Sequence, residues 1–292
     1  MRAGGYQVGP YEPADREAYL GLLREAWGDR AVSGEEFDWW LGGNPAGSVV
    51  SVARMDGRLV GGAAHSLLPM VVDGEQVLTS WSLYAVTHSS ARSRGVWAAL
   101  ESRNECESAE RGASVALTFP NDLTARVFLG RLGWTEITRL RAWARPLLAQ
   151  APAPADTASF DNADDAAAGW PNHVVRDARH LNWRFGDSPR GYRTVRSGGG
   201  YAVVGQTRYR GVEAAVLADL VGGSRDLLRH AVAAASGRAM IALPARDQRA
   251  TFATLGFVPA PYTIRFLGKA LTGKLNADPA AWRFTLGDTD FF

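Results

Sequence analysis

The chain opens with two stretches in which apolar residues recur at helical spacing. Over residues 13–28 the apolar positions return every three or four residues, which predicts an amphipathic helix. Its apolar face comprises Tyr19, Leu20, Leu23 and Trp27. A second, shorter helix is predicted where Phe37, Trp39, Trp40 and Leu41 gather. We therefore expect two helices before the first strands.

Strands dominate the following part of the chain. Residues 48–87 read as a meander, because β-rich runs are separated by the hairpin signals Asp56-Gly57 and Asp73-Gly74. A helix is predicted to begin at residues 96–103, and the run ASVALTF over residues 113–119 has the pattern of a buried strand. This part of the chain therefore alternates between predicted strands and predicted helices.

Two segments of the first half return, in the same order, in the second half. FDWWLGGNP at residues 37–45 is echoed by LNWRFGDSP at residues 181–189, and the segment 113–134 is echoed by 238–257. Within residues 113–134, Asn121 or Asp122 can cap a helix that ends before Gly133. The echoes indicate a tandem repeat of one supersecondary plan.

Residues 149–169 separate the two copies. This segment is rich in Ala, Pro and Asp and has few large apolar residues, as in a linker or a surface excursion. The predicted organisation is an N-terminal domain at 1–148, a linker at 149–169 and a C-terminal domain at 170–292.

A basic turn between a strand and a helix carries the candidate chemistry. The strand SWSLYAV is followed by Arg92, Ser93, Arg94 and Gly95, and a helix begins directly after them. The backbone N–H groups at the start of a helix lack partners and bind anions, and two arginines add donors suited to phosphate oxygens. We expect this turn to bind a pyrophosphate; the alternative is that Arg92 and Arg94 are ordinary surface residues. In the second copy the turn is only GGSRDLL, so we expect no cradle there.

Composition narrows the class of protein. The 292 residues carry a net charge of only +2, which gives no global field for nucleic acid or an anionic membrane. The single cysteine, Cys106, excludes an internal disulfide and fits a reducing compartment. Without an apolar leader or membrane-spanning run, we expect a cytoplasmic protein.

The turn, the strand spacing, Asn121 and the closing Leu132-Gly133-Trp134 together resemble the GNAT superfamily of acyl-CoA-dependent N-acyltransferases. The resemblance covers residues 6–145 well and residues 178–268 weakly. The family turn reads Arg/Gln-x-x-Gly-x-Gly/Ala, and here Trp97 stands in place of its last small residue. The resemblance implies an α/β (α+β) fold with a mixed sheet. It consists of two tandem GNAT-like domains, each a mostly antiparallel sheet with a splayed parallel strand pair and flanking helices.

The resemblance also implies how the co-substrate, acetyl-CoA or another acyl-CoA, binds. Its pantetheine arm would pair with the backbone of Tyr84, Ala85 and Val86. Its pyrophosphate would take the N–H groups from Ser93 through Gly95 and Val96 to Trp97, beside Arg92 and Arg94. Asn121 is a further cofactor-binding candidate.

The usual catalytic residues of the family are missing. SWSLYAV lacks the strand Glu of many relatives, and Phe128 and Leu129 occupy the place of their Tyr. Tyr84, His65 and His88 are therefore the catalytic candidates, with Ser82 as a further substitute. Each has a structural alternative: Tyr84 as a core aromatic, His65 as a buried structural histidine and His88 as a solvated loop residue.

These features favour an N-acetyltransferase acting by direct transfer to a small-molecule primary amine. A non-catalytic GNAT-like module that binds a ligand or partner is the main alternative, and an aminoacyl-tRNA-dependent transferase is a third. The pair Asp288 and Asp290 is too little for a metal site, so we expect none. A C-terminal carboxylate acting as a base is a further alternative. The sequence sets neither the amine nor the oligomeric state.

Overall fold

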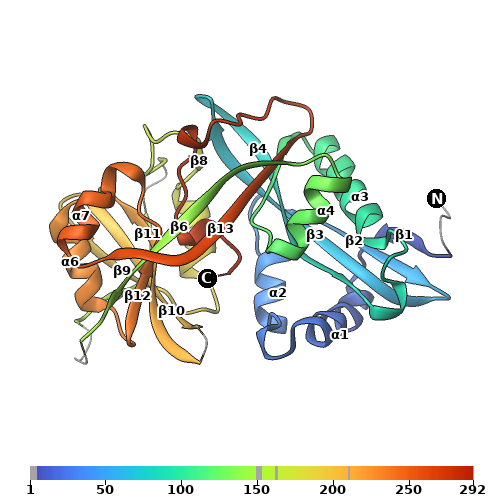
Figure 1. Cartoon of the computed structure of the whole chain (residues 1–292), viewed down its shortest axis with the longest axis horizontal. Coiled ribbons are helices and arrows are strands. Elements are labelled where there is room, and N and C mark those ends of the chain that lie inside the picture. Colours follow the sequence, from blue (N-terminus) through green and yellow to red (C-terminus); the bar gives the residue numbers. More distant parts are fainter. Residues whose placement is uncertain (1–4, 149–152, 162–163, 210, 292) are drawn as a thin grey trace. The chain divides into compact units, whose positions relative to one another are not determined.

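The computed structural model describes residues 5–148, 153–161, 164–209 and 211–291, and the chain divides into two compact units (Figure 1). The first unit consists of Met1–Met70, Gln76–Ile137 and Phe266–Ala277. The second consists of Val71–Glu75, Thr138–Arg265 and Asp278–Phe292. Parallel and antiparallel strands with flanking helices occur in both, so the predicted α/β fold class is confirmed.

The first unit has a mixed sheet with the strand order β1-β2-β3-β4-β5, followed by the end of β13. These strands are β1 (Gln7–Pro10), β2 (Ser48–Met55), β3 (Arg58–Val72), β4 (Glu75–Thr87), β5 (Ala113–Thr118) and β13 (Val258–Ala270). β4 and β5 run parallel, whereas β1 with β2, β2 with β3 and β5 with β13 run antiparallel. The helices are α1 (Arg16–Trp27), α2 (Gly34–Leu41), α3 (Val96–Glu110) and α4 (Asp122–Arg131).

The predicted local signals of the first half of the chain are confirmed. Both predicted hairpins form, with Asp56 at a φ of 49° and Asp73 at a φ of 53°, each followed by a left-handed glycine. Asn121 caps α4, and Gly133 follows the end of that helix with a φ of 72°. The short strand β1 was not predicted, because four residues carry too little alternation to be recognised.

Two adjacent glycines of β3 let helices approach both faces of the sheet. A Cβ atom at Gly61 would lie 2.9 Å from Val96 of α3, and one at Gly62 would lie 2.5 Å from the ring of Tyr19 of α1. Successive residues of a strand point to opposite faces. α1 and α3 therefore cover different faces, and neither position has room for a side chain.

The second unit has the strand order β6-β12-β11-β10-β9-β7. These are β6 (Thr135–Pro146), β7 (Asp156–Thr157), β9 (Arg193–Ser197), β10 (Gly200–Tyr209), β11 (Val212–Val221) and β12 (Ala239–Ala242); β8 (His173–Val174) lies apart from this order. β11 and β12 are its parallel pair. The helices are α5 (Ala178–Leu181), which continues into a π-helical turn (Asn182–Gly186), α6 (Arg225–Ala234) and α7 (Arg249–Thr254).

The second sequence echo corresponds to one local structure formed twice. The N–H of Trp134 donates to the carbonyl of Phe128 at 3.2 Å, and the N–H of Phe257 donates to the carbonyl of Phe252, also at 3.2 Å. The glycine before each aromatic residue has a left-handed φ, 72° and 80° respectively. In each unit the paired aromatic rings then pack together, 4.6 Å and 5.0 Å apart.

The bounds of the two units differ from the predicted 1–148 and 170–292. The described part of the segment 149–169 belongs to the second unit, where β7 pairs with β9 and the ring of Phe160 packs 5.1 Å from that of Tyr201. Residues 149–152 and 162–163 of the predicted linker lie outside the described residues. The first unit, in turn, needs Phe266–Ala277 from the end of the chain.

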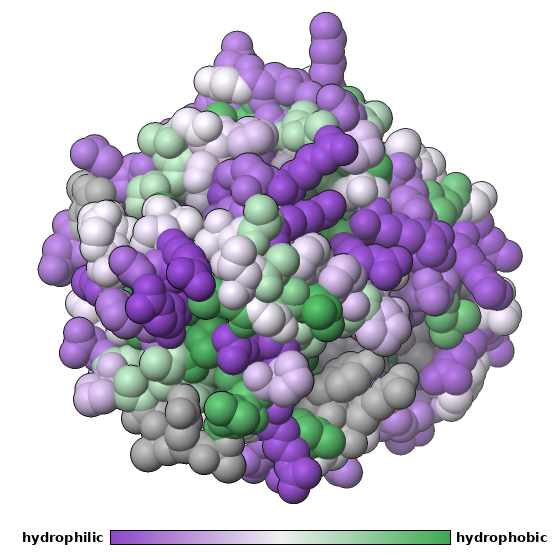
Figure 2. Space-filling view, turned by 60° about the vertical axis from the view of Figure 1, so that its left-hand side comes forward, coloured by the Kyte–Doolittle hydropathy of each residue, from purple (hydrophilic) through white to green (hydrophobic). Residues whose placement is uncertain are grey.

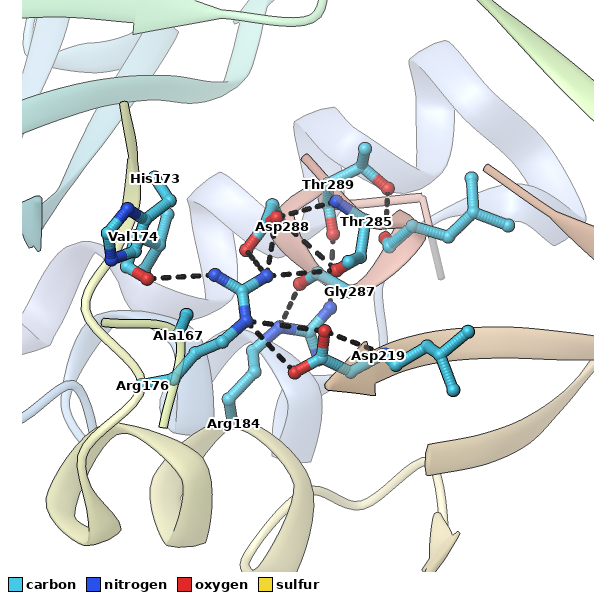
Figure 3. Close-up of polar contacts among 12 residues, drawn as sticks. Ala167, His173, Val174, Arg176, Arg184, Asp219, Thr285, Gly287, Asp288 and Thr289 are labelled. Carbon is cyan, nitrogen blue, oxygen red and sulfur yellow. Dashed lines mark hydrogen bonds and ion pairs between the residues drawn. The ribbon is translucent and has the colours of Figure 1, made fainter. Parts of the chain in front are cut away.

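A buried arginine holds the C-terminal segment in the second unit (Figure 3). Arg176 is 1% exposed, and its guanidinium lies 3.1 Å from a carboxylate oxygen of Asp219 and 2.8 Å from one of Asp288. It also donates to the carbonyl of Val174 at 2.8 Å. Because Asp288 is engaged by Arg176, it is not available as half of a metal site; no cluster of three metal-ligating side chains occurs in the described part of the chain.

A second arginine adds to this attachment. Arg184, 2% exposed, donates to the carbonyls of Gly287 at 2.8 Å and Thr289 at 3.0 Å. The contacts come from both sides of Asp288, so the segment from Thr285 to Thr289 is fixed along its length.

Most large apolar side chains of the described residues are buried. Figure 2 shows one face of the molecule, on which hydrophilic residues surround smaller hydrophobic areas. The described exceptions are Leu123, Leu129, Leu148, Val212, Val258, Tyr262 and Phe291. None of the described helices combines the length and apolarity needed to cross a membrane.

Candidate active site

The parallel strands of the first unit separate partway along their length. β4 pairs with β5 from Leu78 opposite Ala113 to Trp81 opposite Leu117, and the register ends there. β4 itself continues to Thr87. The hydroxyl of Thr118 donates to the carbonyl of Ser82 at 3.1 Å, just past the last pair. Beyond this point the backbone of β4 has lost β5 as its ladder partner, as the predicted splayed pair requires.

β4 bends at Tyr84 directly after the strands separate. Tyr84 has a φ of 53°, a left-handed conformation that is costly for a bulky residue. The Tyr19 hydroxyl donates to the Tyr84 carbonyl at 2.8 Å, and the Tyr84 ring stacks on Phe37 with centroids 6.1 Å apart. Contacts with α1 and α2 therefore hold the bend.

The bend changes which faces the neighbouring side chains occupy, because strict strand alternation would place Ser82 and Tyr84 on one face. The Ser82 hydroxyl instead donates to Glu101 of α3 at 3.1 Å, whereas Tyr84 packs against α1 and α2 on the opposite face. A left-handed residue interrupts the two-residue period of a strand, as in a bulge, so the side chains around it no longer alternate.

The basic turn lies between β4 and α3, where it was predicted. Ser93 and Gly95 have left-handed φ angles of 64° and 78°, and α3 begins at Val96. No side chain of the described residues caps α3, and its first turn contains no acidic residue. Arg92 and Arg94 are exposed beside it. The orphan N–H groups and the two guanidinium groups can therefore bind an anion.

Ala85 and Val86, which were predicted to offer backbone contacts to the co-substrate, follow Tyr84 in β4 and lead toward the basic turn. Ala85 is half-buried and Val86 is buried. Asn121 lies at the N-terminus of α4, where its side-chain oxygen accepts the N–H groups of Leu123 and Thr124, both at 3.0 Å. Because capping engages that oxygen, only the amide nitrogen of the Asn121 side chain can donate to a ligand.

His65 is fully buried and both of its ring nitrogens are engaged. Nδ1 lies 2.7 Å from the hydroxyl of Ser80, and Nε2 lies 2.8 Å from a carboxylate oxygen of Glu101. The side chains of His65 and Glu101 are both 0% exposed. This geometry corresponds to the structural alternative for His65, because both nitrogens have buried protein partners.

His88 is the more accessible histidine. Its Nδ1 accepts the N–H of Ser90 at 3.2 Å, which in the neutral ring places the proton on Nε2. Nε2 lies 3.6 Å from a carboxylate oxygen of Glu25, and the His88 side chain is 35% exposed. This partly exposed imidazole lies close in sequence to the basic turn.

Sequence reasoning missed Glu101, the residue with most partners at this site. Its carboxylate accepts from His65, from Ser82 and, at 3.0 Å, from the indole N–H of Trp97. A signal was present in the sequence: Glu101 follows Trp97 by four residues and so lies on the same helix face. The buried polar residues of α3, Glu101, Asn104, Glu105 and Ser108, also follow one another at helical spacing.

The corresponding helix of the second unit begins differently. α6 is capped by Ser224, whose hydroxyl accepts the N–H of Leu227 at 3.1 Å, and Asp226 lies in its first turn. The Ser224 hydroxyl thus occupies an N–H group that could otherwise bind an anion, and the Asp226 carboxylate repels an anion from this helix end.

Comparisons with known proteins agree with this description. Residues 7–137 match the family model for the acetyltransferase (GNAT) domain. None of the curated proteins matches the sequence. Among solved structures, the chain is similar to GCN5-related N-acetyltransferases from Kribbella flavida (14% identity, TM-score 0.63, 91% of this chain and 71% of that one) and Anabaena variabilis (12%, 0.62, 91% and 73%).

It is also similar to Eis1 from Mycobacterium abscessus, at 19% identity and a TM-score of 0.58, over 91% of this chain and 73% of that one. At such identities the structural likeness establishes the fold alone, while the family model identifies the domain that contains the separated strands and the basic turn. Residues 7–137 therefore form a GNAT acetyltransferase domain.

Proposed function

We propose that this protein transfers an acyl group, acetyl in the simplest case, from acyl-CoA to the primary amine of a small molecule. One observation carries the proposal: β4 parts from β5 and then leads into an uncapped helix N-terminus flanked by two exposed arginines. Donors for a pyrophosphate thus lie at the end of a strand whose backbone can pair with an extended ligand.

Different residues bind different parts of the co-substrate. The N–H groups from Ser93 to Trp97, with Arg92 and Arg94, take the pyrophosphate. The backbone from Tyr84 to Val86 pairs with the pantetheine arm. An N–H of this strand polarises the thioester carbonyl, as an oxyanion-type donor.

The transfer is direct, within a ternary complex of enzyme, acyl-CoA and amine. The neutral amine nitrogen attacks the thioester carbon, and the carbon–sulfur bond breaks. The attacking nitrogen must lose a proton, and the departing thiolate must gain one. A neutral phenol is a suitable acid for a thiolate, so Tyr84 is the first choice for that step. His88 or water collects the amine proton, because both nitrogens of His65 are already engaged. We place the reaction in the cytoplasm, with no nucleic acid or membrane partner.

Release of free CoA thiol from acetyl-CoA, measured across a panel of amines, tests the proposal. We expect at least one amine to raise the rate above the rate without amine. No stimulation by any amine, with any acyl-CoA tried, would contradict the proposed transfer.

Binding is tested separately by thermal stability. A ligand at 100 times its Kd stabilises a fold by about 2.7 kcal/mol, so saturating CoA should raise the melting temperature. Arg92→Glu combined with Arg94→Glu should abolish this rise, because two carboxylates at the turn repel phosphate. Arg208→Glu, which changes an exposed arginine of the second unit, is the matched control. An unchanged rise in the double variant would move the site elsewhere.

A further inference from the structure

The strand before the basic turn lacks the acidic residue of many relatives, yet the fold brings a carboxylate to it from another element. Glu101 of α3 reaches Ser82 of β4, whose hydroxyl donates to it at 3.1 Å. The same oxygen accepts the indole N–H of Trp97 at 3.0 Å, while the other oxygen meets Nε2 of His65 at 2.8 Å.

These partners lie at the two ends of the proposed acyl-CoA site. Trp97 is the last residue of the proposed phosphate cradle and lies in the first turn of α3. Ser82 precedes the left-handed Tyr84 by two residues and follows the last β4–β5 pair. One carboxylate therefore joins the cradle to the strand that bends beside the thioester.

Because Glu101 is buried, its hydrogen bonds hold α3 and β4 in one arrangement. The Glu101 side chain is 0% exposed, so its charge is stabilised only by groups that donate to it. A shift of the first turn of α3, or of β4 at Ser82, would remove a donor from a buried carboxylate. Such a loss is more costly than loss of an ordinary surface hydrogen bond. His65, held between Glu101 and Ser80, fixes the carboxylate from the third side.

We propose that Glu101 is a positioning residue for acyl transfer: it sets the phosphate cradle through Trp97 and the bent strand through Ser82, with His65 orienting it. The inference rests on the proposed acyl-CoA site. It also gives a reason for a tryptophan in place of the small residue of the family turn, because the indole carries an N–H that reaches Glu101. The Trp97 ring meanwhile packs edge-on against Phe128 of α4, with centroids 5.0 Å apart.

The helix α3 offers a matched control for this contact. The indole N–H of Trp134 donates to Glu105 at 2.8 Å, so it is a second indole–carboxylate bond made to the same helix but beyond the cradle. Trp97→Phe and Trp134→Phe each remove one such donor and keep an aromatic ring. A merely structural role predicts equal effects of the two changes.

We expect Trp97→Phe to weaken CoA binding by about tenfold, as for loss of one hydrogen bond to a charged group. Trp134→Phe should bind CoA within about twofold of wild type. Ser82→Ala should lower kcat with little change in CoA affinity, whereas Ser108→Ala, which touches only Ser80 of this network, should not. In a Glu101→Leu background, adding Trp97→Phe should weaken binding no further, because the acceptor of the indole N–H is already lost.

Isothermal titration with CoA, steady-state kinetics and melting temperature are measured for each variant. If Trp97→Phe and Trp134→Phe bind CoA equally, or if Ser82→Ala matches Ser108→Ala in kcat, the positioning role is overturned while the acyl-CoA site stands. If wild type itself binds no acyl-CoA, the proposed function falls and this inference falls with it.

Discussion

At the scale of single residues, Tyr84 stands apart from the other non-glycine residues with left-handed φ among those described. Asp56 and Asp73 lie in hairpin turns and Ser93 lies in the basic turn, whereas Tyr84 lies inside a strand. Left-handed strain of this kind costs on the order of 1–3 kcal/mol and persists only where surrounding contacts enforce it. Here Tyr19 and Phe37 supply those contacts.

Two conservative changes separate the roles of the tyrosines. Tyr84→Phe should lower kcat by at least about tenfold with CoA affinity nearly unchanged, because it removes the proposed acid and keeps the ring. Tyr19→Phe should instead lower the free energy of unfolding by about 1 kcal/mol, because it removes the hydrogen bond to the Tyr84 carbonyl. Kinetics and urea unfolding measure the two effects. Turnover by Tyr84→Phe at the wild-type rate would make Tyr84 a packing residue only.

A second residue-scale prediction concerns His180, which is buried in the second unit. Burial, with the positive charges of Arg176 and Arg184 nearby, lowers the pKa of His180 to about 3. The unfolded chain, with a pKa near 6.5, then binds a proton that the folded chain does not. Stability should therefore be constant above about pH 6.5 and fall below it, by up to ~1.4 kcal/mol per pH unit from this group.

Urea unfolding of wild type and His180→Phe between pH 4 and 8 checks this expectation, with those pH values chosen to bracket the unfolded pKa. The variant should lose part of the acid-side slope, because no imidazole remains to take up a proton. Parallel pH profiles for the two proteins would contradict the assignment.

At the scale of elements, the helix ends formed by α4 and α7 are the clearest shared feature of the two units. Gly133 and Gly256 both have left-handed φ, and a Cβ atom at either position would meet nothing within 4 Å. Substitution by alanine at either position therefore tests the backbone alone, without a packing change.

Gly133→Ala and Gly256→Ala should each lower the free energy of unfolding by about 1 kcal/mol, because alanine pays the left-handed penalty that glycine avoids. Gly130→Ala is the matched control: Gly130 lies within α4, has equal space and lacks a positive φ. That change should be neutral or stabilising. Equal effects at Gly130 and Gly133 in denaturant unfolding would refute the explanation.

Elements with local signals could be predicted from the sequence, and those set by distant contacts could not. The hairpins, the cap at Asn121 and the start of α3 each depend on a few neighbouring residues. The bend at Tyr84 depends on Tyr19 and Phe37, which are far away in the sequence. The burial of His65 beside Glu101 likewise arises only when β3 and α3 pack together, so a candidate base could not be told from a structural residue.

At the scale of the whole molecule, the two units present unequal helix N-termini. α3 is uncapped and basic, whereas Ser224 caps α6 and Asp226 lies in its first turn. We therefore expect one acyl-CoA per chain. Calorimetric titration of the intact protein should give a stoichiometry of one, and Arg92→Glu with Arg94→Glu should remove all of it. Two bound molecules, or residual binding in the variant, would show that the second unit also binds the co-substrate.

The last strand of the first unit's sheet has a consequence for how the chain is made. Leu267 to Ala270 of β13 pair with Thr118 to Val115 of β5, although nearly the whole second unit is translated between them. The ribosome therefore releases the residues that complete the first unit's sheet only after most of the second unit. A nascent chain that stops before Phe266 must hold β5 without that partner. The two units therefore cannot be separated by a single cut in the gene, because a cut ahead of the second unit would remove β13 from the sheet of the first.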